Sequence, residues 1–320
     1  MRPLGEKHPM KTFRTLRGFL EGDEPDEDTR FAFSARRQHK FTFTTRYFIA
    51  ANVWLLRPVA AAALIWAMAA GSARSAEPAA KLIPGSTFAV QFPDMPPTFY
   101  AVFQKTNVPA QMTVFLPTNF DPARKFPSFI FLNGWDGGVG GNPDVARSLC
   151  EGRDFVCVSV PLFKAPNFQV TKPNAPGAGF IMDAEDGKQM WRCFKTMLTK
   201  LEDTVPNIDP AHRILGGFSN GAHATAGLID ESDGEITRRF SAFLFVEGGG
   251  KLQHYELLKG KPFLMVSSNA KSRPRAQQIC DAAKAAGAKA TLVVEDVGKH
   301  DFPASAYPVV RQWLRGPAME

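Results

Sequence analysis

Short apolar runs alternate with longer amphipathic segments along most of the chain after residue 76. Runs with the composition of β-strands lie at 87–92, 98–104, 111–117, 126–132, 155–160, 213–218, 240–246, 262–268 and 290–297. From residue 126 onward they are separated by expected helices at 143–151, 183–203, 220–230, 273–286 and 304–315. This order predicts an α/β domain with a doubly wound sheet that is antiparallel at its early edge and mostly parallel beyond it. We expect residues 77–320 to form one such domain.

A G-x-S-x-G motif occupies 217–221, between the expected strand 213–218 and the expected helix 220–230. Strand, sharp turn and helix make the geometry of a nucleophile elbow, in which Ser219 stands at the apex. Side chains two positions before or after the serine would collide with the neighbouring elements, so glycines are needed there. We predict that Ser219 is a nucleophile. The alternative is a glycine-rich turn that only lets the helix pack closely.

A nucleophilic serine needs a base, and His300 is the candidate. It follows the expected strand 290–297, at the carboxyl end where ligands collect in open α/β sheets. His223 is only four residues after Ser219, but one helical turn on it points along the helix and away from the serine oxygen. The other histidines lie in the leader, before the elbow strand or in an expected helix: His8, His39, His212 and His254. We therefore choose His300.

A glycine-rich loop, 133–141, directly follows the expected strand 126–132 and has five glycines among nine residues. Glycine permits the conformations that bring a backbone N–H close to a nucleophile. The loop lacks the lysine of a phosphate-binding P-loop and the G-x-G-x-x-G order of a dinucleotide site. It is therefore a candidate oxyanion loop.

Together these motifs resemble the α/β-hydrolase superfamily, in its secreted esterase, dienelactone-hydrolase-like and polyhydroxybutyrate-depolymerase-like branches. The resemblance covers about the last three quarters of the chain. It rests on Asn133-Gly134, where the family usually has His-Gly, on 217–221 and on His300-Asp301-Phe302. It implies the α/β-hydrolase fold.

The resemblance also implies roles for single residues. Ser219 corresponds to the nucleophile and His300 to the general base of a catalytic triad. The backbone N–H groups of Asn220 and Trp135 correspond to the oxyanion hole. No metal or organic cofactor is implied.

The triad acid departs from the family pattern. Most members place it after the penultimate strand, here 262–268, but the residues that follow this strand contain no carboxylate. Some hydrolases of this fold place the acid one strand earlier, and Glu247, which follows the expected strand 240–246, is therefore our first choice. Aspartate and glutamate can both hold the imidazole. Asn269 is the alternative, as a neutral group that orients His300. Glu247 would then be a solvated loop residue.

A long irregular stretch at 161–182 leaves the carboxyl end of a central strand. Loops of this length in a compact domain are often functional. Phe168 and Phe180 are expected to line one wall of a substrate pocket, with Trp135 opposite. The alternative is a surface loop whose aromatic side chains pack into the core.

The expected activity is that of an exported serine hydrolase that acts on carboxylic esters. Its substrate would be a small-molecule or polymer ester. Two alternatives stay open: a serine peptidase of the same fold, and a non-catalytic binding protein on a hydrolase scaffold.

The net charge of +7 comes mostly from the leader. Residues 1–76 contain 12 of the 38 basic and 7 of the 31 acidic residues, so the remaining chain carries only +2. We therefore expect no nucleic-acid partner.

An uncharged run of twelve residues, 59–70, follows Arg57 and precedes small residues up to Ala76. Segment 57–76 is thus expected to be a signal peptide, which implies a periplasmic or secreted protein. Its depth in the chain is unusual, and a true start near Val53 would explain it. Otherwise the run is an uncleaved membrane anchor. Residues 1–56 are expected to be a disordered leader or a mis-called start.

The four cysteines, Cys150, Cys157, Cys193 and Cys280, do not have the spacing of a zinc site. In an oxidising compartment they could pair, and as buried thiols they could stay free.

Overall fold

The structure is a computed structural model, and it describes residues 82–91, 111–134, 143–160, 184–250 and 252–320. All of them belong to one compact unit, Ala73–Glu320. The expected leader, the segment 57–76, the strand 98–104 and the loop 161–182 lie outside the described residues, so those expectations stay predictions. Within the described ranges, every helix is too short or too polar to cross a membrane.

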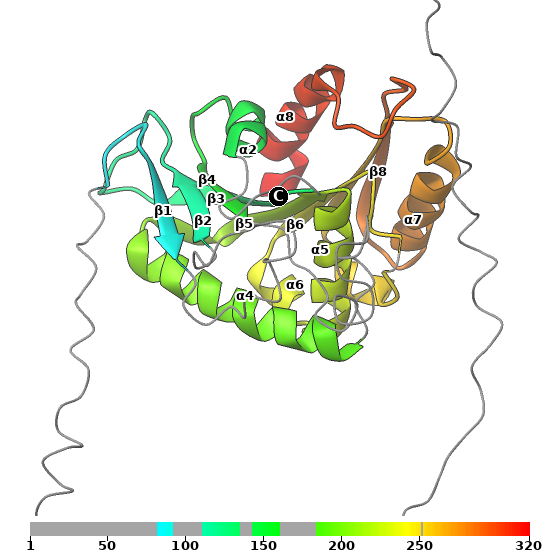
Figure 1. The fold of residues 1–320 in the computed structure, drawn as a ribbon, viewed down its shortest axis with the longest axis horizontal. Helices are drawn as coiled ribbons and strands as arrows, with labels where there is room; N and C mark the ends of the chain where they lie inside the picture. The colour runs from blue at the N-terminus through cyan, green and yellow to red at the C-terminus, as the bar shows by residue number, and fades with distance from the viewer. Residues whose placement is uncertain (1–81, 92–110, 135–142, 161–183, 251) are drawn as a thin grey trace, which may run out of the picture. The chain divides into compact units, whose positions relative to one another are not determined.

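The described strands form one sheet in the order β1-β2-β4-β3-β5-β6-β7-β8 (Figure 1). The two pairs β1–β2 and β2–β4 are antiparallel, and all other neighbours are parallel. The mixed sheet predicted from the alternating pattern is therefore confirmed. Its strands are β1 (Thr87–Gln91), β2 (Gln111–Phe115), β3 (Phe126–Leu132), β4 (Val156–Val160), β5 (Ile208–Phe218), β6 (Ala242–Val246), β7 (Pro262–Ser267) and β8 (Lys289–Val294).

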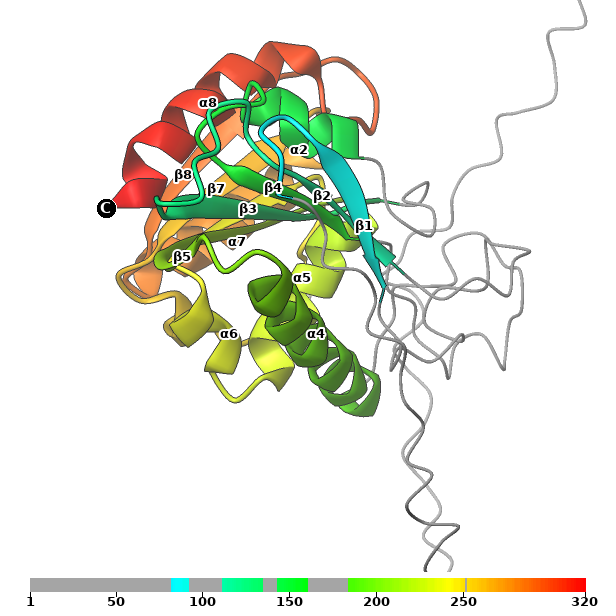
Figure 2. The same cartoon turned by 90° about the vertical axis from the view of Figure 1, so that its left-hand side faces the viewer.

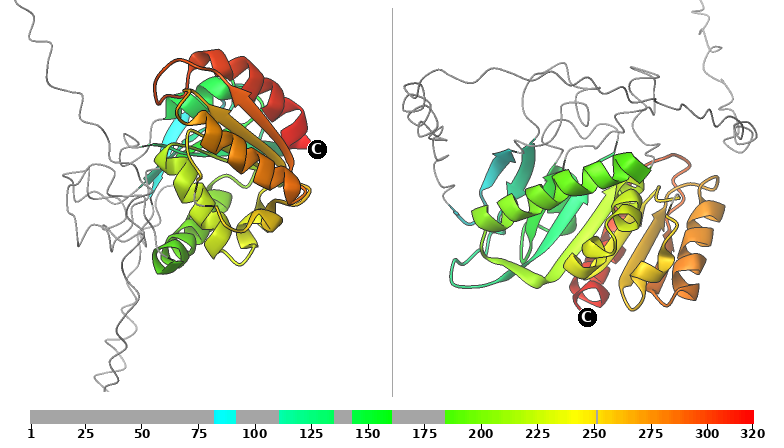
Figure 3. Two further views of the ribbon diagram at one scale, coloured as in Figure 1. Left: turned by 90° about the vertical axis from the view of Figure 1, so that its right-hand side faces the viewer. Right: turned by 90° about the horizontal axis from the view of Figure 1, so that it is seen from below.

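Helices cover both faces of the sheet (Figures 1 and 2). One face packs against α4 (Ala184–Thr204), α5 (Asn220–Glu231), α6 (Glu235–Arg239) and α7 (Arg273–Ala285). The other packs against α2 (Pro143–Leu149) and α8 (Tyr307–Arg315). Seen from below, α4 lies across the strands and α7 lies beside β7 and β8 at the edge of the sheet (Figure 3).

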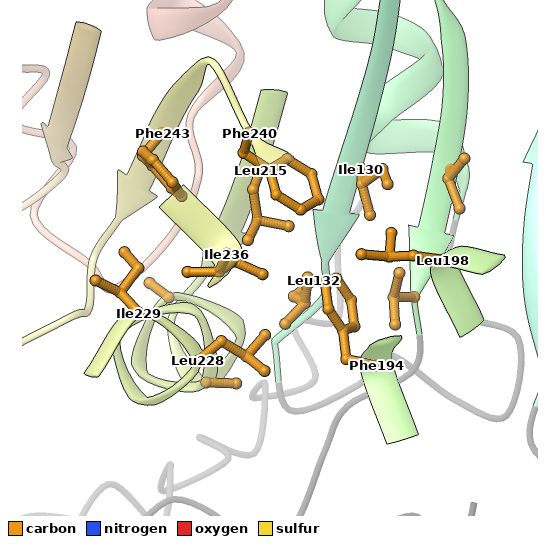
Figure 4. Close-up of a cluster of buried hydrophobic side chains, with 14 of the residues drawn as sticks. Ile130, Leu132, Phe194, Leu198, Leu215, Leu228, Ile229, Ile236, Phe240 and Phe243 are labelled. Carbon is orange, nitrogen blue, oxygen red and sulfur yellow. The ribbon is translucent and has the colours of Figure 1, made fainter. Parts of the chain in front are cut away.

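The central strands are apolar on both sides because both faces are covered. In β6 every residue is buried. Phe243 and Phe245 join the core under α4 and α5, whereas Leu244 and Val246 join the core under α2 and α8. Figure 4 shows part of the first core, where Phe243 lies near Phe240 and Leu215. The edge strand β8 is only partly buried.

The main departure from the expected elements precedes β6. We expected a strand from residue 240, but 235–239 form the short helix α6 and the strand begins at Ala242. Gly234, in the left-handed region at φ 72°, starts this helix. His254 lies just before a 3₁₀ turn, η4 (Tyr255–Leu258), and not within a helix. A second turn, η5 (Ala304–Ala306), takes the first residues of the helix expected at 304–315.

None of the four cysteines forms a disulfide, and all four lie in the described ranges. Cys150, Cys157 and Cys280 are buried. Burial raises the pKa of the Cys150 and Cys280 thiols, so these two are poorly reactive.

Candidate active site

Ser219 forms the turn between β5 and α5. Its backbone has φ 53° and ψ −114°, a conformation that non-glycine residues rarely adopt. The Ser219 N–H donates to the carbonyl of Val246 at the end of β6, over 2.7 Å. Its carbonyl accepts from the His223 N–H, which begins the helix. Strand pairing on one side and helix start on the other thus hold the turn in place.

The two motif glycines are needed because backbone atoms occupy the space of their missing side chains. A Cβ on Gly217 would lie 2.3 Å from the carbonyl carbon of Gly221. A Cβ on Gly221 would lie 1.9 Å from the carbonyl oxygen of Leu132, at the end of β3. The glycine-rich turn therefore brings α5 against the end of β3, where the candidate oxyanion loop starts.

Gly221→Ala is expected to lower the free energy of unfolding by about 3 kcal/mol or more, or to prevent folding, because the clash is with a strand backbone. Gly216→Ala is the matched control in β5. The nearest atoms there are side-chain carbons at 3.1 Å or more, which can shift. We expect a cost of about 1 kcal/mol for the control. Urea unfolding measures both, and equal costs would contradict this account of the motif.

His300 lies on the loop after β8, and both of its ring nitrogens have a partner. Nε2 lies 2.8 Å from Ser219 Oγ. Nδ1 lies 3.1 Å from Glu247 Oε2. The structure thus brings together the serine, histidine and glutamate that the sequence singled out. His223, by contrast, is half-buried along α5.

Glu247 is the first residue after β6, with φ 51°. Its side chain is fully buried, whereas that of His300 is 53% exposed. The interpretation of Glu247 as a solvated loop residue is therefore wrong. A Cβ on the next residue, Gly248, would lie 2.3 Å from the carbonyl oxygen of Ser219, so the turn after β6 rests directly on the elbow.

The Glu247 carboxylate accepts hydrogen bonds from the loop after β7 as well as from His300. Oε1 accepts from the Ser268 N–H and, at 2.7 Å, from the Ser272 hydroxyl. Oε2 accepts from Asn269 Nδ2 at 3.0 Å. The alternative in which the Asn269 amide orients His300 is therefore wrong, because this amide contacts the Glu247 carboxylate.

Opposing effects act on the pKa of Glu247. Burial of the carboxyl raises its pKa, but the hydrogen bonds from His300, Ser268 and Ser272 lower it more. The net result is a pKa below the usual 4.5, so the group is a carboxylate at neutral pH. An ionised acid is what a histidine base needs at Nδ1.

Ser268 has a second function that the sequence analysis missed. Its hydroxyl donates to the Lys299 carbonyl over 2.8 Å and accepts from the Asp301 N–H over 3.1 Å. One serine therefore holds the backbone on both sides of His300. The only sequence signal was its position at the carboxyl end of a parallel strand.

Phe218 was also missed as a site residue. Its ring stacks on the His300 imidazole, with centroids 5.3 Å apart and an angle of 29° between the planes. It occupies the first variable position of G-x-S-x-G, for which the motif sets no residue type.

Among the other site predictions, only Asn220 is described. It is buried and is the first residue of α5, where backbone N–H groups have no partner within the helix. Its N–H is therefore available to an oxyanion. Trp135, Phe168 and Phe180 lie outside the described residues, and their roles stay predictions. The described ranges contain no group of three or more metal-ligating side chains.

No protein-family model matches this sequence, and a search of curated proteins found no match either. Solved structures do match. A thermostable esterase aligns with a TM-score of 0.50 and 22% identity, over 73% of this chain and 64% of that one. This chain therefore spans less than two thirds of that esterase.

Two other structures align less well. The esterase Est2 of the Planctomycetes species Thermogutta terrifontis gives a TM-score of 0.45 at 17% identity, over 72% of this chain and 89% of its own. A putative dipeptidyl aminopeptidase IV of Bacteroides ovatus gives 0.47 at 12%, over 73% and 35%. Identities this low concern the fold alone. Together with the mixed sheet and its strand order, the match to the thermostable esterase shows that this chain has the α/β-hydrolase fold.

Proposed function

We propose that this protein is a serine hydrolase that cleaves carboxylic esters through an acyl-enzyme. The observation that carries the proposal is the continuous hydrogen-bonded chain from Ser219 through His300 to Glu247. Each link is within hydrogen-bonding distance, and the acid is buried and ionised. Such a chain converts a weak hydroxyl nucleophile into a strong one.

In the proposed reaction, Ser219 Oγ attacks the ester carbonyl while His300 Nε2 accepts its proton. Glu247 holds the proton on Nδ1, which fixes the tautomer, and stabilises the imidazolium that forms. His300 then gives its proton to the departing alkoxide, which leaves as the alcohol. Water repeats the sequence on the acyl-enzyme and releases the carboxylic acid.

The oxyanion is proposed to bind the backbone N–H groups of Asn220 and Trp135. The place of Asn220 at the start of α5 supports this, because the helix dipole favours negative charge there. The esterase description of one structural neighbour is consistent with ester substrates. Small-molecule and polymer esters both fit the proposal.

The test uses the full chain with p-nitrophenyl esters of increasing acyl length and, in parallel, peptide p-nitroanilides. We expect ester turnover with an initial burst of about one p-nitrophenol per enzyme, because the acyl-enzyme accumulates. Peptide anilides should turn over far more slowly. Faster cleavage of the anilides would favour a peptidase, and the absence of both turnover and fluorophosphonate labelling would exclude a serine hydrolase.

A further inference from the structure

Within the described ranges, the His300 ring interacts with Phe218 as well as with the two other residues of the proposed triad. Its Nε2 is hydrogen-bonded to Ser219 and its Nδ1 to Glu247. Phe218 lies on the face of the ring, with centroids 5.3 Å apart. This contact leaves both nitrogens free for their hydrogen bonds.

The position of Phe218 is fixed from several sides. It is the last residue of β5 and pairs with Val246 in β6. Its ring packs against the core under α2 and α8. A Cβ on Gly134 would lie 2.9 Å from Cδ1 of Phe218, so a side chain at position 134 would push the ring out of place. The structure therefore maintains a rigid aromatic surface beneath the imidazole.

We propose that Phe218 is a positioning residue whose ring face stabilises the imidazolium form of His300 during the reaction. The face of an aromatic ring carries partial negative charge, and a cation within about 6 Å of its centroid is attracted to it. The proposal rests on the proposed function, because the imidazolium is the form that His300 takes once it accepts the serine proton.

Other charged groups of the described residues lie on the elements that carry His300 and Glu247 or follow them in the sheet. Glu247 contacts the edge of the ring, at Nδ1, and not its face. On the loop of His300 itself, Lys299 and Asp301 form an ion pair over 2.8 Å. Arg273, which starts α7, and Asp296, after β8, lie 3.6 Å apart. Asp301 also interacts electrostatically with His300, so the aromatic face adds to the stabilisation of the cation by Asp301 and Glu247.

The test replaces Phe218 in the full chain with mono-, di- and trifluorinated phenylalanines, which keep the ring shape and progressively withdraw its negative charge. We expect kcat for a p-nitrophenyl ester to fall stepwise, by about 3- to 30-fold in total, with KM unchanged. Stacking with the neutral imidazole depends much less on that charge than the attraction of the cation does, so the steps that form the cation should slow most. Phe218→Leu should lose a similar amount.

The matched control is the same fluorinated series at Phe131. This buried ring of β3 stacks on Phe302, with centroids 6.2 Å apart. A purely structural effect of fluorine would appear equally there, whereas we expect no change in kcat. A flat series at Phe218 in an active enzyme would overturn the positioning role and leave the serine-hydrolase proposal standing.

A second measurement does not depend on turnover. Protonation of ¹⁵N-labelled His300 can be followed by NMR in the full chain and in the trifluorinated variant. If Phe218 stabilises the cation, the ring of the variant protonates at lower pH than that of the wild type. An unchanged titration would overturn the proposal even if no ester were cleaved, whereas lack of ester cleavage alone would overturn only the proposed function.

Discussion

Ser219→Ala is expected to reduce ester turnover by about 10³–10⁶-fold and to abolish labelling by a fluorophosphonate. Without Oγ no acyl-enzyme can form. The ester can then be cleaved only by direct attack of water, which the remaining hydrogen-bond donors of the site accelerate far less. The fold should be retained, because the turn is held by backbone hydrogen bonds of Ser219 that alanine also makes. Initial rates measure the ester turnover, mass spectrometry detects the fluorophosphonate label, and circular dichroism shows whether the fold is retained.

Two histidine variants serve as controls for this result. His300→Ala should be about as inactive as Ser219→Ala, because residues that act as a unit fail together. His223→Ala should keep most of the turnover and cost mainly stability, since His223 is half-buried in α5 and Ser219 Oγ has His300 Nε2 as its partner. Full activity in Ser219→Ala, or an inactive but folded His223→Ala, would contradict the assignment.

Glu247→Gln is expected to lower kcat by roughly 10²–10⁴-fold. The amide removes the negative charge beside Nδ1 and can present an N–H to the ring, which favours the wrong tautomer. Asn269→Ala is the matched control, because Asn269 donates to the same oxygen but does not contact the imidazole in the arrangement we find. Its effect should be at least tenfold smaller. The opposite ranking would make Asn269 the orienting group.

The same variant should change how stability depends on pH. The pKa of Glu247 is lower in the folded protein than its usual 4.5, so the unfolded chain takes up this proton first as the pH falls. The ionised group therefore contributes stability above about pH 4.5, and this contribution is lost as the pH falls through the lower folded pKa. Urea unfolding from pH 7 to pH 3 should show a smaller loss in Glu247→Gln than in wild type.

The parts of the site that local sequence determines could be predicted. The motif at 217–221 and its strand and helix place Ser219 without any knowledge of the fold. His300 required one further assumption, that the carboxyl ends of parallel strands meet at one edge of the sheet, and Glu247 also required the resemblance to hydrolases that carry the acid one strand earlier. The contacts between Ser219, His300 and Glu247 that follow from this assumption are present in the structure.

The parts that depend on neighbours in space were not predictable from patterns along the chain. Ser268 and Ser272 matter because the loop after β7 folds over the Glu247 carboxylate, and nothing in their spacing shows this. Phe218 belongs to the site because the His300 imidazole stacks on its ring, a contact that the order of residues does not reveal. Helix α6 was missed because five residues are too few to show a helical period.

The direct pairing of β5 with β6 divides the site into two mechanical parts. Ser219 and Glu247 stand at the ends of adjacent strands, and Ser219 donates its N–H to β6 while Gly248 lies against its carbonyl. Nucleophile and acid therefore share one rigid frame. His300 stands on the loop after the edge strand β8, and Ser268 links the backbone of that loop to the carboxylate of Glu247. A designer who transplants this site needs two neighbouring strand ends for the fixed pair, and must carry over the serine after the third strand, Ser268, together with the histidine loop that it holds.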